Sequence, residues 1–253
     1  MSTTLRIRDL GVAFGARPLF TGLDLTLADG DVTAVVGPNG SGKSTLMRTL
    51  VGDRAPESGS IRLSPPGASV AWLPQAVPDP AETLLAYARR RTGVEAADAE
   101  LEHASAAMAS GMPGGSDRYA TALERWLSLG AAELDSHLPE VAARVGLGVD
   151  VTRPLGSLSG GQAARVSLVT VLLSHHDVLL LDEPTNDLDA RGLDLVADFV
   201  RSHGGPVLIA SHDRSFLDAV ATSVVELDPA QQRVAHYTGS WSDYVSARTL
   251  DRA

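Results

Sequence analysis

The chain has 253 residues, of which 21 are Lys or Arg and 31 are Asp or Glu, so its formal net charge is −10; it contains no cysteine. This composition predicts a soluble globular protein of one or two domains, excludes a disulfide framework, and argues against a surface devoted to binding a phosphate backbone. Without cysteine, a reducing cytoplasmic location is the natural expectation. The start shows no secretory signal, and prolines interrupt the longest uncharged stretch, 63–78, so we expect no direct membrane insertion.

Short apolar runs predict the strands of the fold. Residues 5–8 and 23–27 alternate polar and apolar side chains, as half-exposed antiparallel strands do. Later runs are apolar without alternation, which is typical of strands buried on both faces of a parallel sheet. These runs span residues 32–36, 70–73, 178–181 and 207–210. Polar or glycine-rich residues follow each run, and ligands bind outside the carboxyl ends of such strands, so we expect one shared site there.

The middle of the chain, from about 81 to 149, is rich in Ala, Leu, Glu and Arg, with apolar residues at helical spacing. Gly111–Gly115 interrupts this pattern, so we expect two helices joined by a tight connection, the second capped at Ser116 or Asp117. We assign residues 1–80 and 150–236 to a discontinuous α/β core, 81–149 to a helical subdomain with a short arm-like hairpin, and 237–253 to a tail leading into a helix or interdomain linker.

Residues 37–45 match the phosphate-binding pattern G-x-x-x-x-G-K-[ST], after the 32–36 strand and before an apolar helix. The glycines let backbone N–H groups converge on phosphate oxygens, Lys43 would neutralise the β and γ charges, and the Ser44 hydroxyl can ligate Mg²⁺. Lys43 is the only lysine of the chain, which argues against a chance glycine-rich turn. The predicted binding residues of this loop are Gly37, Pro38, Asn39, Gly40, Ser41, Gly42, Lys43, Ser44 and Thr45.

Two further strand or helix ends carry candidate residues. Asp182 and Glu183 follow an apolar strand, beside the phosphate-binding loop. Asp182 is predicted to hold Mg²⁺, directly or through water, and Glu183 to orient or deprotonate the attacking water. Ser159 opens a helix whose free N–H groups make a second anion-binding site. Taken alone, the stretch favours an ordinary Gly-Gly turn with Ser159 as the helix cap, but its position between Gln75 and Asp182 favours the anion site.

The order of these signals along the chain resembles an ATP-binding cassette (ABC) domain. The signals are the 37–45 loop, Gln75, Leu158-Ser-Gly-Gly-Gln162, the 178–183 run and His212. The resemblance implies an α/β fold of the P-loop NTPase class: an ABC nucleotide-binding domain with an antiparallel β subdomain and an inserted α-helical subdomain. It also implies an ATPase that uses ATP and Mg²⁺.

The same resemblance implies roles for individual residues. Phe14 matches the aromatic residue that stacks on adenine, and Gln75 the residue that senses Mg²⁺ and the attacking water. His212 matches the switch that contacts the γ-phosphate, and Asp189 the loop that crosses to the partner domain. The signature residues that would clamp ATP held by a second cassette are Ser159, Gly160, Gly161 and Gln162. Two cassettes would therefore be needed, and we expect the isolated chain to hydrolyse ATP poorly.

Three stretches resemble the ABC-F group, whose tandem cassettes act on ribosomes. They are the 182–189 run, the Ser211–Leu217 run and the Tyr237–Tyr244 ending. Asp187 departs from the His usual in that group, and this chain carries one cassette rather than two. We therefore expect it to be the N-terminal half of a longer protein, with a homodimer as the alternative. The predicted arm carries 6 Arg against 10 Asp or Glu over residues 81–148, and its one basic cluster, Arg89–Arg91, also fits a solvated helix end.

Two functions of different classes follow. In the first, ATP closes two cassettes and the closed form binds a ribosome, as in a translation factor or a ribosome-protecting antibiotic-resistance protein. In the alternative, the chain is the nucleotide-binding subunit of an ABC transporter and docks a separate membrane subunit. A cassette ATPase of DNA repair or cluster assembly is a third, weaker possibility. The loop that contains Asn186 and the tail after Glu226 favour the first.

Overall fold

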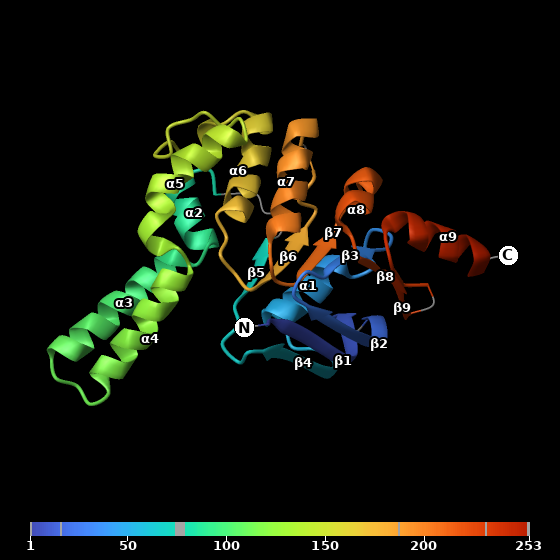
Figure 1. Cartoon of the computed structure of the whole chain (residues 1–253), viewed down its shortest axis with the longest axis horizontal. Coiled ribbons are helices and arrows are strands. Elements are labelled where there is room, and N and C mark those ends of the chain that lie inside the picture. The colour runs from blue at the N-terminus through green and yellow to red at the C-terminus, as the bar shows by residue number, and fades with distance from the viewer. Residues whose placement is uncertain (1, 16, 74–78, 187, 231, 252–253) are drawn as a thin grey trace. The chain divides into compact units, whose positions relative to one another are not determined.

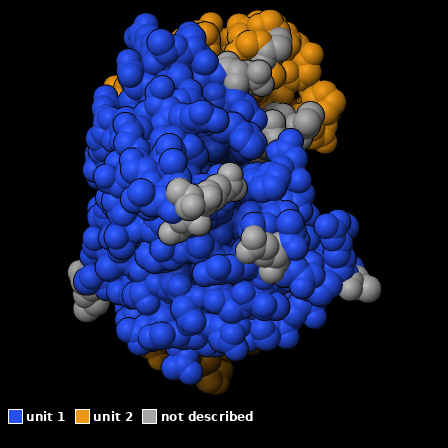
Figure 2. Space-filling model, turned by 90° about the vertical axis from the view of Figure 1, so that its right-hand side faces the viewer, with its two compact units in different colours: residues 1–75, 176–253 blue, residues 76–175 orange. Residues whose placement is uncertain are grey.

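The computed structural model describes residues 2–15, 17–73, 79–186, 188–230 and 232–251. The chain forms two compact units, residues 1–75 with 176–253 and residues 76–175, shown in blue and orange in Figure 2. Each unit is described by itself below. The domain boundaries expected near residues 80 and 150 stay a prediction.

The first unit is built on a six-stranded sheet in the order β5-β6-β7-β3-β8-β9, in which only the last pairing is antiparallel (Figure 1). The strands are β3 (Val32–Val36), β5 (Val70–Leu73), β6 (Val178–Asp182), β7 (Val207–Ala210), β8 (Ser223–Asp228) and β9 (Arg233–Thr238). Every residue of β3, β6 and β7 is buried, which confirms the parallel strands predicted from unbroken apolar runs.

A second sheet of three antiparallel strands has the order β2-β1-β4, with β1 at Thr4–Phe14, β2 at Arg17–Ala28 and β4 at Ser58–Ser64. Its alternating residues send one row of side chains into the main hydrophobic core, where Ile7 and Leu25 lie. Helix α1 (Lys43–Val51) adds Leu46 and Met47 to the same core. Helix α1 is thereby held rigidly by apolar packing, directly after the phosphate-binding pattern.

The remaining helices of the first unit are α7 (Ala190–Ser202), α8 (Arg214–Val220) and α9 (Trp241–Asp251). Helix α9 lies within the tail that the sequence predicts to enter a helix. It is anchored by Tyr244, which is buried and contacts the rings of Tyr237 and Trp241, each with a centroid separation of 5.1 Å. Aromatic edge contacts of this kind stabilise the packing of a short helix.

The second unit is helical. Its elements are α2 (Leu84–Arg91), α3 (Val94–Ala109), α4 (Gly115–Ser128), α5 (Ala131–Arg144), a 3₁₀ turn (Leu155–Ser157) and α6 (Gly160–Leu172). The stretch 81–149 thus holds four helices, and the expectation of two was wrong. Gly93 and Gly130 both adopt left-handed conformations, and at each of them one helix ends and the next begins. Unlike the Gly111–Gly115 turn, neither position has a proline beside it that would have marked the break in the sequence. Helix α4 begins after Gly114, not at a Ser116 or Asp117 cap.

Helices α3 and α4 form a hairpin with close backbone contact. A Cβ atom on Gly115 would lie 2.9 Å from the Met108 Cα, so a glycine lets the two helices approach at the turn.

Within the described part of the chain, no helix combines the length and apolar character needed to cross a bilayer.

Candidate functional site

The phosphate-binding pattern connects β3 to α1 in the first unit. Gly37 follows β3 directly, and Gly42 is the residue before α1, with φ of 105° in the left-handed region. A Cβ atom on Gly37 would lie 2.6 Å from the Leu227 carbonyl oxygen of β8, and one on Gly42 would lie 3.0 Å from the Leu19 side chain. Gly37 is therefore required by its close approach to the β8 backbone, and Gly42 by its left-handed conformation beside the Leu19 side chain. The resulting loop is fixed by the sheet on one side and by the core on the other.

The side chains of this loop are held inside it. Lys43 is only 9% exposed, and its Nζ donates hydrogen bonds to the carbonyl oxygens of Gly37, at 2.9 Å, and Pro38, at 3.4 Å. The Ser41 hydroxyl is buried and has no hydrogen-bond partner among the described residues. Among the residues described, no carboxylate is in salt-bridge contact with Lys43. A buried ammonium group that faces backbone carbonyls in this way is suited to pairing with an anion.

Two acidic residues stand at the end of β6, two strands away from β3. In the sheet, Ala210 of β7 lies opposite Val35 of β3 on one side and Asp182 of β6 on the other, so the three strand ends are in line. The hydroxyls of Thr185 and Ser211 are 2.7 Å apart and tie the loops after β6 and β7 together. This register confirms that the carboxylates and His212 share one edge of the sheet, as the sequence predicts.

Glu183 is the most constrained residue of this edge. Its φ is 52°, a left-handed conformation that costs about 1 kcal/mol or more for a residue with a side chain. The backbone N–H of Glu183 donates to the Ala210 carbonyl at 2.8 Å, and this bond holds the residue in place. One carboxylate oxygen, Oε1, lies 3.3 Å from His212 Nε2, whereas Oε2 is buried without a hydrogen-bond partner among the described residues.

The electrostatics of Glu183 follow from this burial. Desolvation raises the pKa of Glu183 above its ordinary value, while the nearby His212 and Lys43 oppose the rise and Asp182 adds to it. The raised pKa brings the carboxylate closer to the range in which it accepts a proton efficiently. A strained, buried carboxylate with one free oxygen is suited to general-base chemistry.

These groups line one cavity of about 810 Å³ in the first unit. The predicted residues that it brings together are Phe14, Asn39, Gly40, Gly42, Lys43, Ser44, Thr45, Asp182, Glu183 and His212. Phe14 lies at its rim with 67% of its surface exposed, although a large apolar side chain is normally covered. The cavity therefore combines an exposed aromatic face, a lysine, hydroxyls and carboxylates.

The same cavity is lined by further residues that the sequence reasoning did not select: Arg17, Leu19, Arg48, Trp72 and Asn186. The guanidinium of Arg48 lies over the Trp72 ring at 5.2 Å. Helical spacing could have identified Arg48, since it lies four residues after Ser44 on the same face of α1. Trp72 belongs to a different strand, and only the folded arrangement brings it to the loop.

Other predicted residues lie elsewhere. Gly37 and Pro38 line a second cavity, described below. Asp189 caps α7, its carboxylate accepting a hydrogen bond from the Gly192 N–H at 2.9 Å. Gln75 and the departure at Asp187 fall outside the described residues.

The signature residues belong to the second unit. Ser159 caps α6 in a capping box: its hydroxyl oxygen accepts a hydrogen bond from the Gln162 backbone N–H, and its own backbone N–H donates to Gln162 Oε1. Gly160 and Gly161 form the first turn of that helix. The structure confirms the helix start that the sequence predicts at Ser159, and Ser159 also acts as an ordinary helix cap.

In the basic cluster Arg89–Arg91 of the same unit, Arg89 and Arg90 pair with carboxylates, and Arg90 stays exposed. The Arg89 guanidinium pairs with Asp98 and with Asp135, both at 2.5 Å, and Arg90 pairs with Glu82 at 2.8 Å. Asp98 also accepts a hydrogen bond from the Trp126 indole at 2.6 Å. These contacts tie the helices of the second unit together.

Among the described residues, no group of three or more acidic or histidine side chains could hold a metal.

Comparisons with known proteins agree with this arrangement. The family model described as ABC transporter matches residues 20–186. The chain is 31% identical to the tylosin resistance ATP-binding protein TlrC of Streptomyces fradiae, over 99% of this chain and 47% of that protein. It is also 31% identical to the energy-dependent translational throttle protein EttA of Haemophilus influenzae, over 95% of this chain and 37% of that protein. The chain thus spans less than half the length of these relatives.

A solved structure of the ATP-binding subunit of an ABC transporter has the same fold. It matches this chain with a TM-score of 0.66 and 22% sequence identity, over 92% of this chain and 89% of that one.

Proposed function

The chain belongs to the ATP-binding cassette family and is an ATPase domain of that family, and we propose that it works as one cassette of an ABC-F-like protein that acts on the ribosome. The observation that carries the site assignment is that Lys43, Glu183 and His212 line one cavity although they follow three different strands. The cavity volume of about 810 Å³ suits a nucleoside triphosphate.

In the proposed complex, Phe14 stacks on adenine and the loop backbone with Lys43 binds the phosphates. The Ser41 hydroxyl, which is buried and has no hydrogen-bond partner among the described residues, fits a site for an anion. The oxygen atoms of Ser44 and Asp182 are ligands that suit the divalent cation bound to that anion. Mg²⁺ held by Ser44 and Asp182 would neutralise charge on the phosphates. The predicted contribution of Gln75 to this cation belongs to the same proposal.

Glu183 is the proposed general base of hydrolysis. Its carboxylate takes a proton from water while the water oxygen bonds to the γ-phosphorus and the bond from that phosphorus to the bridging oxygen breaks, which releases ADP. His212, 3.3 Å from the Glu183 carboxylate, is placed to contact both the base and the transferred phosphoryl group. Both residues act at the strand ends that the sheet register brings together.

A second cassette would complete the site. Ser159 and Gly161 start α6, and the positive end of this helix is suited to the phosphates of ATP bound by another cassette. Asp189 lies on the loop proposed to cross between the two. The partner is the other half of a longer protein or a second copy of this chain.

Concentration dependence tests this pairing. If two chains form each active site, phosphate release per chain should rise with protein concentration, because association obeys mass action. Ser159→Ala should lower the rate without lowering ATP affinity, whereas Ser157→Ala, outside the helix cap, should not. A turnover per chain that is constant over a hundredfold range of concentration would contradict the pairing.

The ribosomal target is supported by the relatives, one named for tylosin resistance and one as a translational throttle. We expect the Glu183→Gln variant, loaded with ATP, to sediment with purified ribosomes and to be released in ADP. Co-sedimentation that does not depend on the nucleotide would count against the proposal. Binding to the membrane subunit of a transporter, with no ribosome binding, would favour the transporter alternative.

A further inference from the structure

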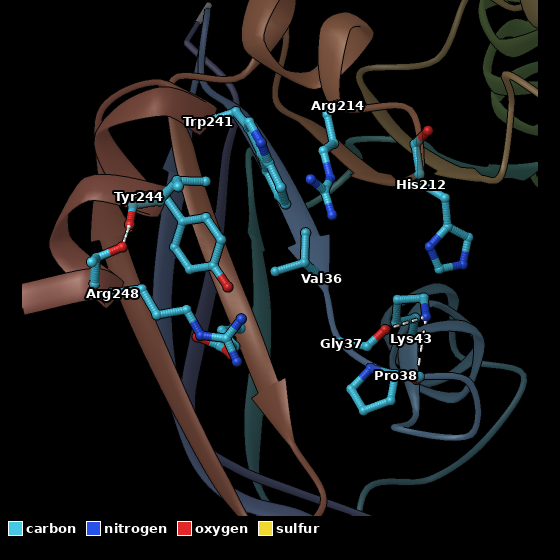
Figure 3. Close-up of a pocket in the computed structure, with 13 residues that line it drawn as sticks. Val36, Gly37, Pro38, Lys43, His212, Arg214, Trp241, Tyr244 and Arg248 are labelled. Atoms are coloured by element: carbon cyan, nitrogen blue, oxygen red, sulfur yellow. Dashed lines mark hydrogen bonds and ion pairs between the residues drawn. The ribbon is translucent and has the colours of Figure 1, made fainter. Parts of the chain in front are cut away.

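A second cavity, of about 680 Å³, lies beside the phosphate-binding loop in the first unit (Figure 3). One wall is the loop itself, with Gly37, Pro38 and Lys43, and the other comes from α8 and α9. Lys43 and His212 line both this cavity and the nucleotide cavity, so the two share a rim. The second cavity has no role in the function proposed above.

The charged side chains that line this cavity leave positive charge available on Arg214 and Lys43. Arg248 forms an ion pair with Glu226 at 2.5 Å, and Glu226 is the carboxylate among the lining residues. Arg214 also lines the cavity but is exposed, and within the described chain it makes no ion pair and no side-chain hydrogen bond. Lys43 adds a second positive charge from the loop side. The lining therefore favours an anion, although the chain as a whole carries a formal charge of −10.

An aromatic surface faces the same space. Figure 3 shows the side chains of Trp241 and Arg214 both extending into the cavity. The indole of Trp241 is held by its contact with the Tyr244 ring at 5.1 Å. Tyr244 is in turn fixed beneath it by burial and by the Arg248 guanidinium 5.9 Å from its ring. Trp241 is thus a pre-positioned stacking surface, which binds a planar group at low entropic cost.

Glu226 links this wall to the loop. It lies opposite Val36, the last residue before the phosphate-binding loop, in the β3–β8 pairing. The Glu226–Arg248 pair therefore fixes α9 to β8, the strand that pairs with β3 next to the loop. Because both walls are anchored to one sheet, the distance between the aromatic surface and the cations is set by the fold.

We propose that this cavity is a second nucleotide site, which takes a nucleoside monophosphate with its base on Trp241 and its phosphate on Arg214. An aromatic face stacks on any base, and a guanidinium pairs with phosphate in two parallel hydrogen bonds. The cavity volume is sufficient for a nucleoside monophosphate, and its shared rim at Lys43 and His212 would place the ligand next to bound ATP. This inference adds to the proposed function of the first cavity and rests on it only for the neighbouring ATP.

The test uses equilibrium dialysis of the whole chain with labelled AMP. The Glu183→Gln variant, saturated with Mg-ATP to block hydrolysis, should bind one AMP in addition to one ATP. Arg214→Gln and Trp241→Leu should each weaken AMP binding roughly tenfold or more, without changing ATP affinity. Trp241→Phe should retain most of the binding, and Arg62→Gln, an exposed arginine on β4 outside both cavities, should leave it unchanged.

The outcomes separate this inference from the proposed function. A chain that binds no ATP contradicts the proposed function. A chain that binds ATP and no further AMP contradicts only the second site, as does AMP binding that is equal in the parent, Arg214→Gln and Trp241→Leu. Inorganic phosphate that binds as tightly as AMP and displaces it would show that the anion, without the base, accounts for binding, and would also overturn the nucleotide assignment. Circular dichroism and thermal unfolding establish that each variant is folded.

Discussion

In the first unit, Lys43 and Glu183 follow two strands of one sheet, β3 and β6, and line one cavity with little of either side chain exposed, whereas in the second unit Arg89 pairs with Asp98 and Asp135. Both regions concentrate charge, but only the first leaves it available: Glu183 Oε2 has no hydrogen-bond partner among the described residues. In the second, the Arg89 guanidinium donates hydrogen bonds to both carboxylates. Charge marks a functional site here when it is buried and unsatisfied, and supports structure when it is paired.

The largest expected effect is on the rate of ATP hydrolysis, from replacing Glu183, the proposed base in the first unit. Glu183→Gln keeps the shape of the side chain but removes the proton acceptor, so turnover should fall by about 100-fold or more while ATP affinity stays the same. Steady-state phosphate release and equilibrium ATP binding measure the two quantities. Glu57→Gln, at an exposed position outside the cavity, is the matched control. Normal turnover in Glu183→Gln would mean that another group accepts the proton.

The pH dependence of turnover sharpens the same contrast. Burial raises the pKa of Glu183 above the ordinary glutamate value of 4.5. The base works when deprotonated, so the rate should fall as the pH decreases through this raised pKa, and the fall should begin above pH 4.5. Rates measured from pH 4.5 to 8 at saturating ATP test this. A rate that stays flat down to pH 4.5, in a chain that remains folded, is the contrary result.

A smaller effect is expected from the paired charges of the second unit. Arg89→Gln leaves Asp98 and Asp135 without their common partner, and the free energy of unfolding should fall by about 1 kcal/mol, since these side chains are one-third to one-half exposed. Arg118→Gln, an exposed arginine on α4 without an ion pair in the described chain, should have almost no effect. Urea unfolding followed by circular dichroism compares them. Equal stability of the two variants would mean that the Arg89 pairs contribute nothing.

The smallest expected effect concerns His203, which ends α7. Burial lowers the pKa of His203 below 6.5, with Asp177 partly opposing the shift. The unfolded chain therefore binds a proton more readily, so this residue contributes stability above pH 6.5 that is lost as the pH falls through its folded-state pKa. His203→Gln should reduce the loss of stability between pH 6.5 and 5, measured by urea unfolding at each pH. An unchanged pH dependence would remove His203 as a contributor.

The sheet and the phosphate edge were predictable because each depends on local sequence. Unbroken apolar runs identified β3, β6 and β7, and the residues directly after them supplied Lys43, Glu183 and His212. These signals are local in the sequence. Because the strands are parallel, their carboxyl ends lie at one edge of the sheet, and the residues that follow them meet there.

What the sequence did not predict depends on contacts between distant segments. The number of helices in 81–149 was underestimated, because isolated glycines at 93 and 130 end helices only when tertiary packing selects the left-handed conformation. Trp72 reaches the nucleotide cavity through strand order, and Arg214 and Trp241 meet at the second cavity from different helices. The pairing of Arg89 required acidic partners 9 and 46 residues away.

The central claim is that the loop around Lys43 binds ATP, and equilibrium binding of ATP to the parent, Lys43→Ala and Lys43→Arg chains tests it most directly. Lys43 is 9% exposed and faces the loop carbonyls, so removing its ammonium group should lower ATP affinity by at least about 100-fold. Lys43→Arg, which keeps the charge but changes its geometry, should give an intermediate affinity. ATP affinity in Lys43→Ala equal to that of the parent would contradict the account.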